Sequence, residues 1–110
     1  MSHCYILVGH EVVEEPDLMA WAQWLEKADH VVRRTRVGEQ RVSTVFLGLD
    51  HSFMQDGVNP LVFETMVFEG DSYEDKFCKR YCTWDEAVAG HEDCVTRLKA
   101  GEPLKALTDE

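Results

Sequence analysis

VSTVFLGLDH (residues 42–51) and PLVFETMVFE (residues 60–69) are the two stretches of this sequence that decide its fold. Both are rich in β-branched and aromatic residues, and the connection between them contains the turn-forming pairs Asp56-Gly57 and Asn59-Pro60. This pattern predicts two strands joined by a long hairpin loop. Neither stretch alternates cleanly between polar and apolar residues, so both faces of the predicted sheet need cover.

The rest of the chain predicts further strands and two helices. A first strand is expected from Cys4 through Gly9-His10 to Glu15, and a helix over residues 17–28 begins at the N-cap Asp17. The expected apolar stripe of this helix consists of Leu18, Trp21, Ala22, Leu25 and Ala28. The segment VVRRTRVGEQRV (residues 31–42) predicts a strand with a turn near residues 38–40 that leads into the first central stretch.

A short strand over residues 76–82 precedes the second helix. Thr83 and Glu86 fit a capping box at its start, and Gly101 ends it. The predicted order is β-α-β-β-β-β-α, an α+β class with a mainly antiparallel β-sheet of four to five strands and two α-helices. We expect a single domain over residues 1–100 and a polar, poorly ordered tail over residues 101–110.

Two helices of this length are expected to cover one face of such a sheet but not both. Either the sheet curls over itself, or a second copy of the chain covers the other face. A two-fold dimer is the common solution. We therefore expect a homo-oligomer, with a dimer as the leading form.

The formal charge of −10 argues against general nucleic-acid binding, which needs a basic surface, and it repels anionic membranes. No apolar run is long enough to cross a bilayer, and the N-terminus MSHCYILVG lacks the basic start and the long apolar segment of a secretory signal. Four cysteines without such a signal indicate reduced thiols in a cytoplasm.

The combined pattern of several segments resembles a family of small uncharacterised proteins encoded by tailed phages and prophages. The matching segments are VSTVFLGLDH (42–51), LVFETMVF (61–68), RYCTWDEA (80–87) and Gly90-His91, with weaker support from Trp21-Ala22 and Trp24. The resemblance covers about residues 20–98. It implies the cytoplasm of a bacterial host and carries no established activity. These relatives more often have serine where this chain has Cys82, which weakens a thiol or metal role there.

His91 is the strongest single candidate for a catalytic residue. It lies at helical spacing on an apolar stripe, so its ring is expected to point at the sheet, where desolvation disfavours the imidazolium. Glu64 and Asp50 are candidate partners, and these groups with Tyr81 are candidates for an acid–base pair. The alternative is a buried histidine satisfied by a carboxylate or a carbonyl group.

Asp50-His51 stands where the first central stretch enters its long loop, which is a common location for sites. The pair is a candidate for binding a metal or ordering a ligand. The alternative is a turn in which the Asp50 side chain bonds to the backbone.

The cysteines raise the question of zinc. Cys78 and Cys82, followed by His91 and Cys94, are the right ligand types. In a strand, however, the Cα atoms of residues 78 and 82 are about 13 Å apart, too far to share one tetrahedral ion. If Cys82 has left the strand to enter the helix, this distance shrinks and zinc stays an alternative. We predict no metal site and favour buried free thiols.

Basic residues are concentrated in one short segment. Arg33, Arg34, Arg36 and Arg41 fall within nine positions that contain one acid, Glu39. Arginine forks suit phosphates and carboxylates. Arg80-Tyr81, at another strand end, is a further candidate because an aromatic ring beside an arginine can stack on a base. The alternative is pairing of these arginines with surplus carboxylates across strands or subunits.

The leading hypothesis is a non-catalytic, homo-oligomeric binding protein for a small anionic ligand, such as a nucleotide signal captured in phage counter-defence. It needs no cofactor. Its expected ligand-binding residues are Arg33, Arg34, Arg36, Asp50, His51, Glu64, Arg80, Tyr81 and His91. One alternative is an acidic inhibitor that imitates DNA and docks on a host protein. The other is a small hydrolase or metalloenzyme that uses Asp50, His51, Glu64 and His91.

Overall fold

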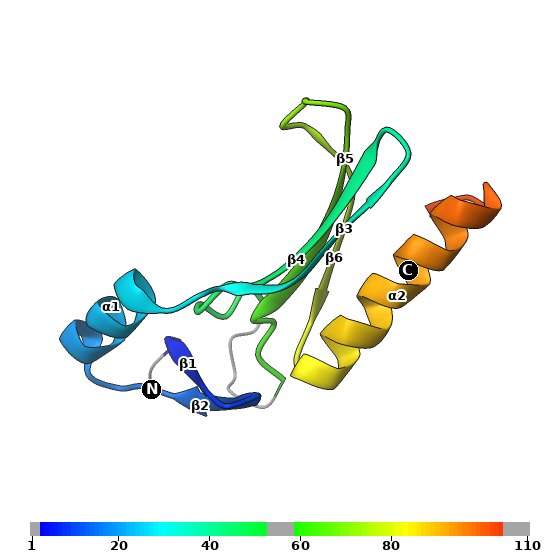
Figure 1. Cartoon of the computed structure of the whole chain (residues 1–110). Coiled ribbons are helices and arrows are strands. Elements are labelled where there is room, and N and C mark those ends of the chain that lie inside the picture. Colours follow the sequence, from blue (N-terminus) through cyan, green and yellow to red (C-terminus); the bar gives the residue numbers. More distant parts are fainter. Residues whose placement is uncertain (1–2, 53–58, 105–110) are drawn as a thin grey trace.

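The computed structural model describes residues 3–52 and 59–104 (Figure 1). In chain order its elements are β1 (Tyr5–Val8), β2 (Glu11–Glu14), α1 (Leu18–Lys27), β3 (Val31–Val37), β4 (Gln40–Phe46), β5 (Phe63–Glu69), β6 (Asp75–Tyr81) and α2 (Trp84–Ala100). The strands form two antiparallel sheets, one of two strands and one of four. The predicted α+β class is therefore confirmed.

The larger sheet is a meander in which each strand pairs with its neighbour in the sequence, in the order β3-β4-β5-β6. Gly38 and Glu39 form the turn between β3 and β4, with Val37 paired to Gln40 and Gly38 at a φ of 60°. This turn agrees with the predicted hairpin.

The N-terminal strand differs from the prediction. Instead of forming one strand from Cys4 to Glu15, the chain folds back at Gly9 and forms the β1–β2 hairpin. Gly9 has a φ of 65°, which a β-branched residue would rarely adopt. The order is thus β-β-α-β-β-β-β-α. The apolar residues on both sides of Gly9-His10 gave the sequence the look of one continuous strand.

The two central strands are shorter than the stretches that predicted them, and some of the residues after β4 bond to the N-terminal segment. The amide of Tyr5 donates to the carbonyl of Gly48 at 2.8 Å, and the indole Nε1 of Trp21 donates to the same oxygen at 3.1 Å. Gly48 has a φ of 81°, and a Cβ there would lie 2.9 Å from Cδ1 of Leu25. A glycine is therefore needed where α1 docks on the end of β4.

Both helices begin and end as the sequence predicts. The carboxylate of Asp17 accepts hydrogen bonds from the amides of Met19 and Ala20 at the start of α1. Thr83 and Glu86 form the predicted capping box of α2, and Gly101 ends it in a left-handed conformation with a φ of 73°.

The sequence predicts both helices on one face of the sheet, and this prediction is wrong. Only α2 lies across the four-stranded sheet, whereas α1 and the β1–β2 hairpin lie beside one end of it (Figure 1). Trp24 of α1 packs edge-on against Phe46 at that end, with ring centroids 5.7 Å apart. Leu18, predicted to lie on the buried stripe of α1, is 63% exposed. The sheet face opposite α2 therefore has no helix over it among the described elements.

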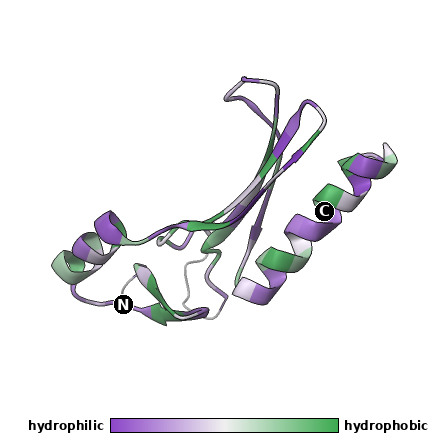
Figure 2. Ribbon diagram, viewed as in Figure 1, coloured by the Kyte–Doolittle hydropathy of each residue, from purple (hydrophilic) through white to green (hydrophobic). Residues whose placement is uncertain are grey.

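The core consists of two clusters along the sheet. The first joins the hairpin, the end of the sheet and the start of α2, and contains Tyr5, Phe46, Val62, Phe63, Tyr81 and Ala87. The second lies under the rest of α2 and contains Val42, Val67, Phe77, Cys94 and Val95. Figure 2 shows that hydrophobic and hydrophilic residues are mixed along the strands and around α2.

Neither of the two helices in the described ranges has the length and apolar character needed to cross a membrane.

Candidate functional site

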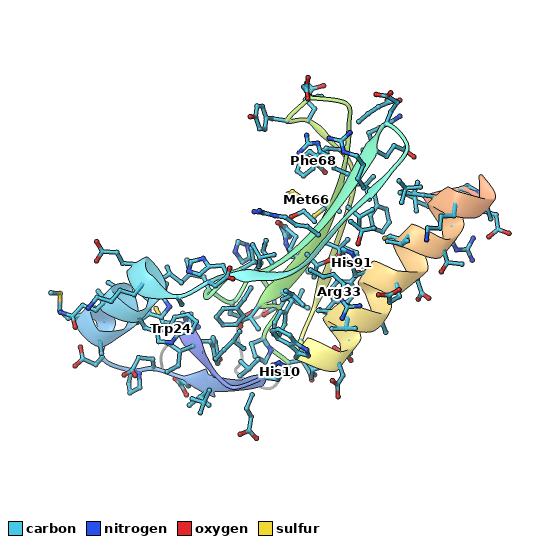
Figure 3. The ribbon with its side chains drawn as sticks, viewed as in Figure 1. His10, Trp24, Arg33, Met66, Phe68 and His91 are labelled. Carbon is cyan, nitrogen blue, oxygen red and sulfur yellow. The ribbon has the colours of Figure 1, made fainter. Side chains whose placement is uncertain are left out.

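The two faces of the four-stranded sheet carry different side chains because successive residues of a strand point in opposite directions. We call the side that α2 covers the covered face and the other side the open face. Met66 and Phe68 lie on the open face, whereas His91 of α2 and Arg33 lie between the sheet and α2 (Figure 3). The open face combines apolar and basic groups and offers the most distinctive site in the described part of the molecule.

A hollow of about 450 Å³ lies on the open face over β3, β4 and the end of β5. We call it the arginine hollow. The side chains that give it its character are Arg34, Arg36, Arg41, Ser43, Phe68 and Tyr73. Its volume falls in the range of small-molecule sites, which often combine apolar surface with a few polar groups.

Arg41 is held in place by the turn between β5 and β6. Its Nε donates to the carbonyl of Gly70 at 2.8 Å, and its Nη2 donates to the carbonyl of Ser72 at 2.6 Å. Its guanidinium also lies over the ring of Phe68, 5.0 Å from the centroid. Of its five N–H groups, three remain after these two bonds, so Arg41 presents a fixed positive charge with donors to spare.

Arg34 and Arg36 extend from β3, the edge strand, and both are exposed. In the β3–β4 pairing, Arg36 stands directly opposite Arg41, and Arg34 stands opposite Ser43. Like charges directly opposite each other in a sheet are destabilising. No ion pair within residues 3–52 and 59–104 includes any of these three arginines.

Farther along the open face, Glu64 and Arg80 form an ion pair. The Nε of Arg80 donates to Oε2 of the buried Glu64 at 2.9 Å, and the thiol of Cys78 donates to the same oxygen at 3.3 Å. Burial, aided by the Glu64 carboxylate, raises the pKa of Cys78 to about 11. The predicted alternative for Arg80, pairing with a carboxylate across strands, is what the structure shows.

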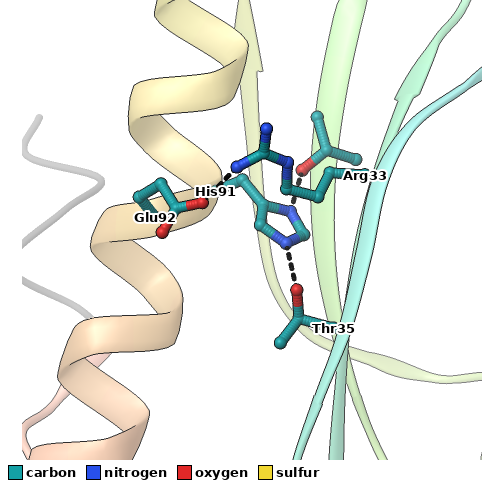
Figure 4. A network of polar contacts seen from close by, with 5 residues as sticks. Arg33, Thr35, His91 and Glu92 are labelled. Atoms are coloured by element: carbon teal, nitrogen blue, oxygen red, sulfur yellow. Dashed lines mark hydrogen bonds and ion pairs between the residues drawn. The ribbon is translucent and has the colours of Figure 1, made fainter.

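Arg33 lies on a different face of the sheet from Arg34 and Arg36, because successive residues of β3 point in opposite directions. Arg33 and Arg34 are in continuous register with β4, so the alternation of the strand places Arg33 on the covered face, where it forms an ion pair with Glu92 of α2 (Figure 4). Arg33 is therefore not part of the arginine hollow, although it directly precedes Arg34 in the sequence.

His91 points at the sheet, as predicted, but its partners are hydroxyl groups. Its Nδ1 lies 2.8 Å from Oγ1 of Thr44, and its Nε2 lies 2.9 Å from Oγ1 of Thr35 (Figure 4). The Thr44 hydroxyl is also 2.5 Å from that of Thr65. A neutral imidazole satisfies this arrangement by donating from one nitrogen and accepting at the other. Burial lowers the pKa of His91, against the opposing effect of the Glu92 carboxylate, and so favours that neutral form.

The suggested acid–base pair of His91 with Glu64 or Asp50 is not formed. Glu64 lies on the opposite face of the sheet in its pair with Arg80. The Oδ1 of Asp50 accepts hydrogen bonds from the amides of Ser52 and Leu61, at 2.8 and 2.9 Å. His91, Glu64 and Asp50 thus lie in three different environments.

Asp50 organises the start and end of the long connection between β4 and β5. Burial alone would raise its pKa, but the hydrogen bonds from Ser52 and Leu61 outweigh this effect and the pKa of Asp50 is lowered. This is the side-chain turn that the sequence analysis held as the alternative to a site. His51 beside it is exposed, and the predicted turn pair Asp56-Gly57 lies outside the described residues.

Tyr81 faces away from Arg80, since adjacent strand residues point to opposite faces, so the two do not form a joint stacking site. Its ring is buried beneath α2 at Gly90, where a Cβ would lie only 2.2 Å from the tyrosine oxygen. Burial raises the pKa of Tyr81. Gly90 and Tyr81 together set the close approach of α2 to β6.

The cysteines do not gather around a common centre. Cys78 belongs to the open face, whereas Cys94 is a residue of α2 that is buried in the core. Burial raises the pKa of Cys94 to about 11. Within the described ranges, no group of three His, Cys, Asp or Glu side chains is arranged to hold a metal ion.

The sequence analysis missed three residues of the arginine hollow: Ser43, Phe68 and Tyr73. Two-residue alternation in β4 and β5 was a usable signal, because it places Ser43 on the face of Arg41 and Phe68 on the face of Glu64. Tyr73 follows the polar turn after β5, to which Arg41 is bonded, and no local pattern indicated its place at the hollow.

No protein-family model, curated protein sequence or solved structure matches this chain.

Proposed function

We propose that this chain is a non-catalytic binding protein for small, multiply charged anions, which it takes up in the arginine hollow. One observation carries the proposal. In a chain with a net charge of −10, Arg34, Arg36 and Arg41 come together on one sheet face and none of them forms an ion pair with a described residue. An anion would supply the missing counter-charge.

The geometry of the three side chains suits phosphate or carboxylate groups. Arg34 and Arg36 are two residues apart on one strand, so their Cα atoms are separated by about 7 Å. Guanidinium groups at this spacing can approach one phosphate from two sides, and each offers a planar fork of donors. Arg41 contributes a third charge that its bonds to Gly70 and Ser72 have already fixed, which lowers the entropy lost on binding.

Two features of the described groups support binding rather than catalysis. The thiols of Cys78 and Cys94, with pKa values raised to about 11, stay protonated at neutral pH and are poor nucleophiles. The imidazole of His91 has both nitrogens engaged by threonine hydroxyls. Neither arrangement supplies an activated nucleophile or a free base beside the arginine hollow.

The setting of this role rests on the resemblance to tailed-phage proteins. It supports a place in the cytoplasm of a bacterial host, where binding of an anionic signal would serve counter-defence. The proposed protein is a homo-oligomer, supported by the large apolar side chains that α1 and the β1–β2 hairpin leave exposed. Leu18 and Met19 are 63% and 68% exposed, and Val8 and Val13 of the hairpin are also exposed.

Titration calorimetry with inorganic pyrophosphate tests the anion site. We expect binding that weakens with added salt, and a loss of about tenfold or more in Arg34→Ala, because a hydrogen bond to a charged group contributes about 1.5–3 kcal/mol. Lys27→Ala is the matched control, since it removes one exposed positive charge from α1, outside the hollow. Absence of binding, or equal losses in the two variants, would refute the proposal.

Sedimentation equilibrium tests the second part. We expect a mass above that of the 12.7 kDa chain, and a return to the monomer mass in a Leu18→Glu, Met19→Glu double variant. A monomer at every concentration would contradict homo-oligomerisation and would leave the anion site standing.

A further inference from the structure

Tyr73 is the most exposed large apolar side chain in the described part of the chain, at 90% exposure, and it lines the arginine hollow. An aromatic ring so exposed contributes little to the core. It stands beside positive groups, since the hollow it borders also contains Arg34, Arg36 and Arg41. The same site thus offers charge for an anion and a free ring face for a flat group.

The segment that carries Tyr73 is tied to the sheet. Ser72, the residue before it, accepts a hydrogen bond from Nη2 of Arg41 at 2.6 Å, and Gly70 accepts one from Nε at 2.8 Å. The amide of Ser72 in turn donates to the carbonyl of Glu69 at 3.1 Å. Arg41 therefore fixes both a charge of the hollow and the backbone next to the aromatic ring at its border.

Phe68 does not offer the same surface. Its ring is half-buried and lies under the guanidinium of Arg41, which occupies the face that a ligand would need. Tyr73 is the aromatic group of the hollow with an accessible face. A nucleobase is a planar group of the right size for this face, and nucleobases stack on aromatic side chains with little preference for sequence.

We propose that the ligand of the arginine hollow is a nucleoside phosphate, with its base stacked on Tyr73 and its phosphates on Arg34 and Arg36. This inference rests on the proposed function and adds the ligand class to it. Free nucleotides fit the observations better than a nucleic-acid strand, because the chain's charge of −10 disfavours a long polyanion outside the hollow.

The test compares ligands that share one half of the nucleotide. Calorimetry at one fixed salt concentration is carried out with ADP, UDP and inorganic pyrophosphate on the full chain and on Tyr73→Ala. We expect at least one nucleoside diphosphate to bind about tenfold more tightly than pyrophosphate, the effect of stacking one base. Tyr73→Ala should remove this advantage, so that nucleoside diphosphates and pyrophosphate then bind with about equal affinity.

Two further variants separate stacking from other effects. Tyr73→Trp should retain or increase the nucleotide advantage, because the larger ring keeps a stacking surface. Met19→Ala is the control, since it removes another exposed apolar side chain from α1, outside the hollow, and should change neither affinity.

The outcomes distinguish the two proposals. If the nucleoside diphosphates and pyrophosphate bind alike and Tyr73→Ala changes neither, the nucleotide assignment is overturned while anion binding stands. If pyrophosphate and the nucleotides all fail to bind, both proposals fall. If a nucleotide binds more tightly but Tyr73→Ala keeps the full advantage, the base is recognised elsewhere and the assignment to Tyr73 is wrong.

Discussion

The two faces of the four-stranded sheet are built from the same strands but have opposite chemistry. On the covered face, polar groups such as Thr44, Thr65 and His91 are buried and bonded to one another. On the open face, Arg34 and Arg36 extend from the edge strand without a described carboxylate partner. The comparison separates polar side chains that bond to one another inside the core from polar side chains that remain available to a ligand. Residue type alone does not make this distinction, whereas the partners of each group do.

The largest expected difference between the faces concerns two phenylalanines of the same strand. Phe63 is fully buried on the covered face, and Phe68 is half-buried on the open face beneath Arg41. We expect Phe63→Ala to lower the free energy of unfolding by about 3–5 kcal/mol, the cost of an emptied core site. Phe68→Ala should cost about 1–2 kcal/mol, because only part of its surface leaves water on folding.

Urea unfolding followed by circular dichroism measures both values. Equal losses in the two variants would mean that the open face is buried as fully as the covered one, for example by another copy of the chain. That result would remove the contrast on which the arginine hollow depends.

The next prediction concerns the close contact of α2 with β6. Replacing glycine by alanine within a helix normally stabilises it by about 0.5–1 kcal/mol. At Gly90 we expect Gly90→Ala to destabilise the fold by about 1–3 kcal/mol instead, because the new methyl group would meet the ring of Tyr81. Thermal unfolding measures the sign, and Ala89→Gly at the exposed neighbouring position, expected to cost about 1 kcal/mol, is the control. A stabilising Gly90→Ala would contradict the contact.

The third prediction tests the neutral state of His91. Since burial lowers its pKa in the folded chain, the unfolded chain binds the proton first as the pH falls. The stability that His91 provides is complete above about pH 6.5 and declines below it, by up to about 1.4 kcal/mol per pH unit, until the pH reaches the lowered pKa.

Urea unfolding at a series of pH values from neutral to mildly acidic measures this slope. His91→Gln should reduce it, whereas His51→Gln, at an exposed position, should not. If His91→Gln leaves the slope of the unfolding free energy against pH unchanged, the neutral state proposed for His91 is wrong.

The smallest effect is expected at Arg34. Because Arg34 is exposed and forms no ion pair with a described residue, Arg34→Ala should change the free energy of unfolding by less than about 0.5 kcal/mol. The same variant should weaken anion binding by about tenfold or more. A large loss of stability would show that Arg34 supports the fold rather than a ligand.

Local signals in the sequence predicted much of the fold. The caps at Asp17 and Thr83, the end at Gly101 and the turn at Gly38-Glu39 each depend on neighbouring residues, so the sequence reveals them directly. The break at Gly9 was missed because the apolar pattern continues across it. The place of α1 beside the sheet depends on Gly48 and Trp21, residues far apart in the chain, and local patterns contain no such information.

The candidate site was predicted only in part. The cluster of arginines was visible, and the two-residue alternation of β3, which separates Arg33 from Arg34 and Arg36, was a usable signal that the sequence analysis did not apply. His91 was correctly expected to face the sheet, yet its threonine partners come from β3 and β4. Asp50 had a local partner, the amide of Ser52, and the turn alternative considered for it agrees with the structure.

The meander of the larger sheet also bears on how the chain reaches its native state. Every strand pair in it joins neighbours in the sequence, so most of this sheet can form without closing large loops, which favours rapid folding. The contacts of Cys4 and Tyr5 with Leu49 and Gly48 instead join segments more than forty residues apart. We therefore expect the β3–β4 hairpin to be structured early in the folding transition state, and the N-terminal hairpin to dock last on a sheet that has already formed.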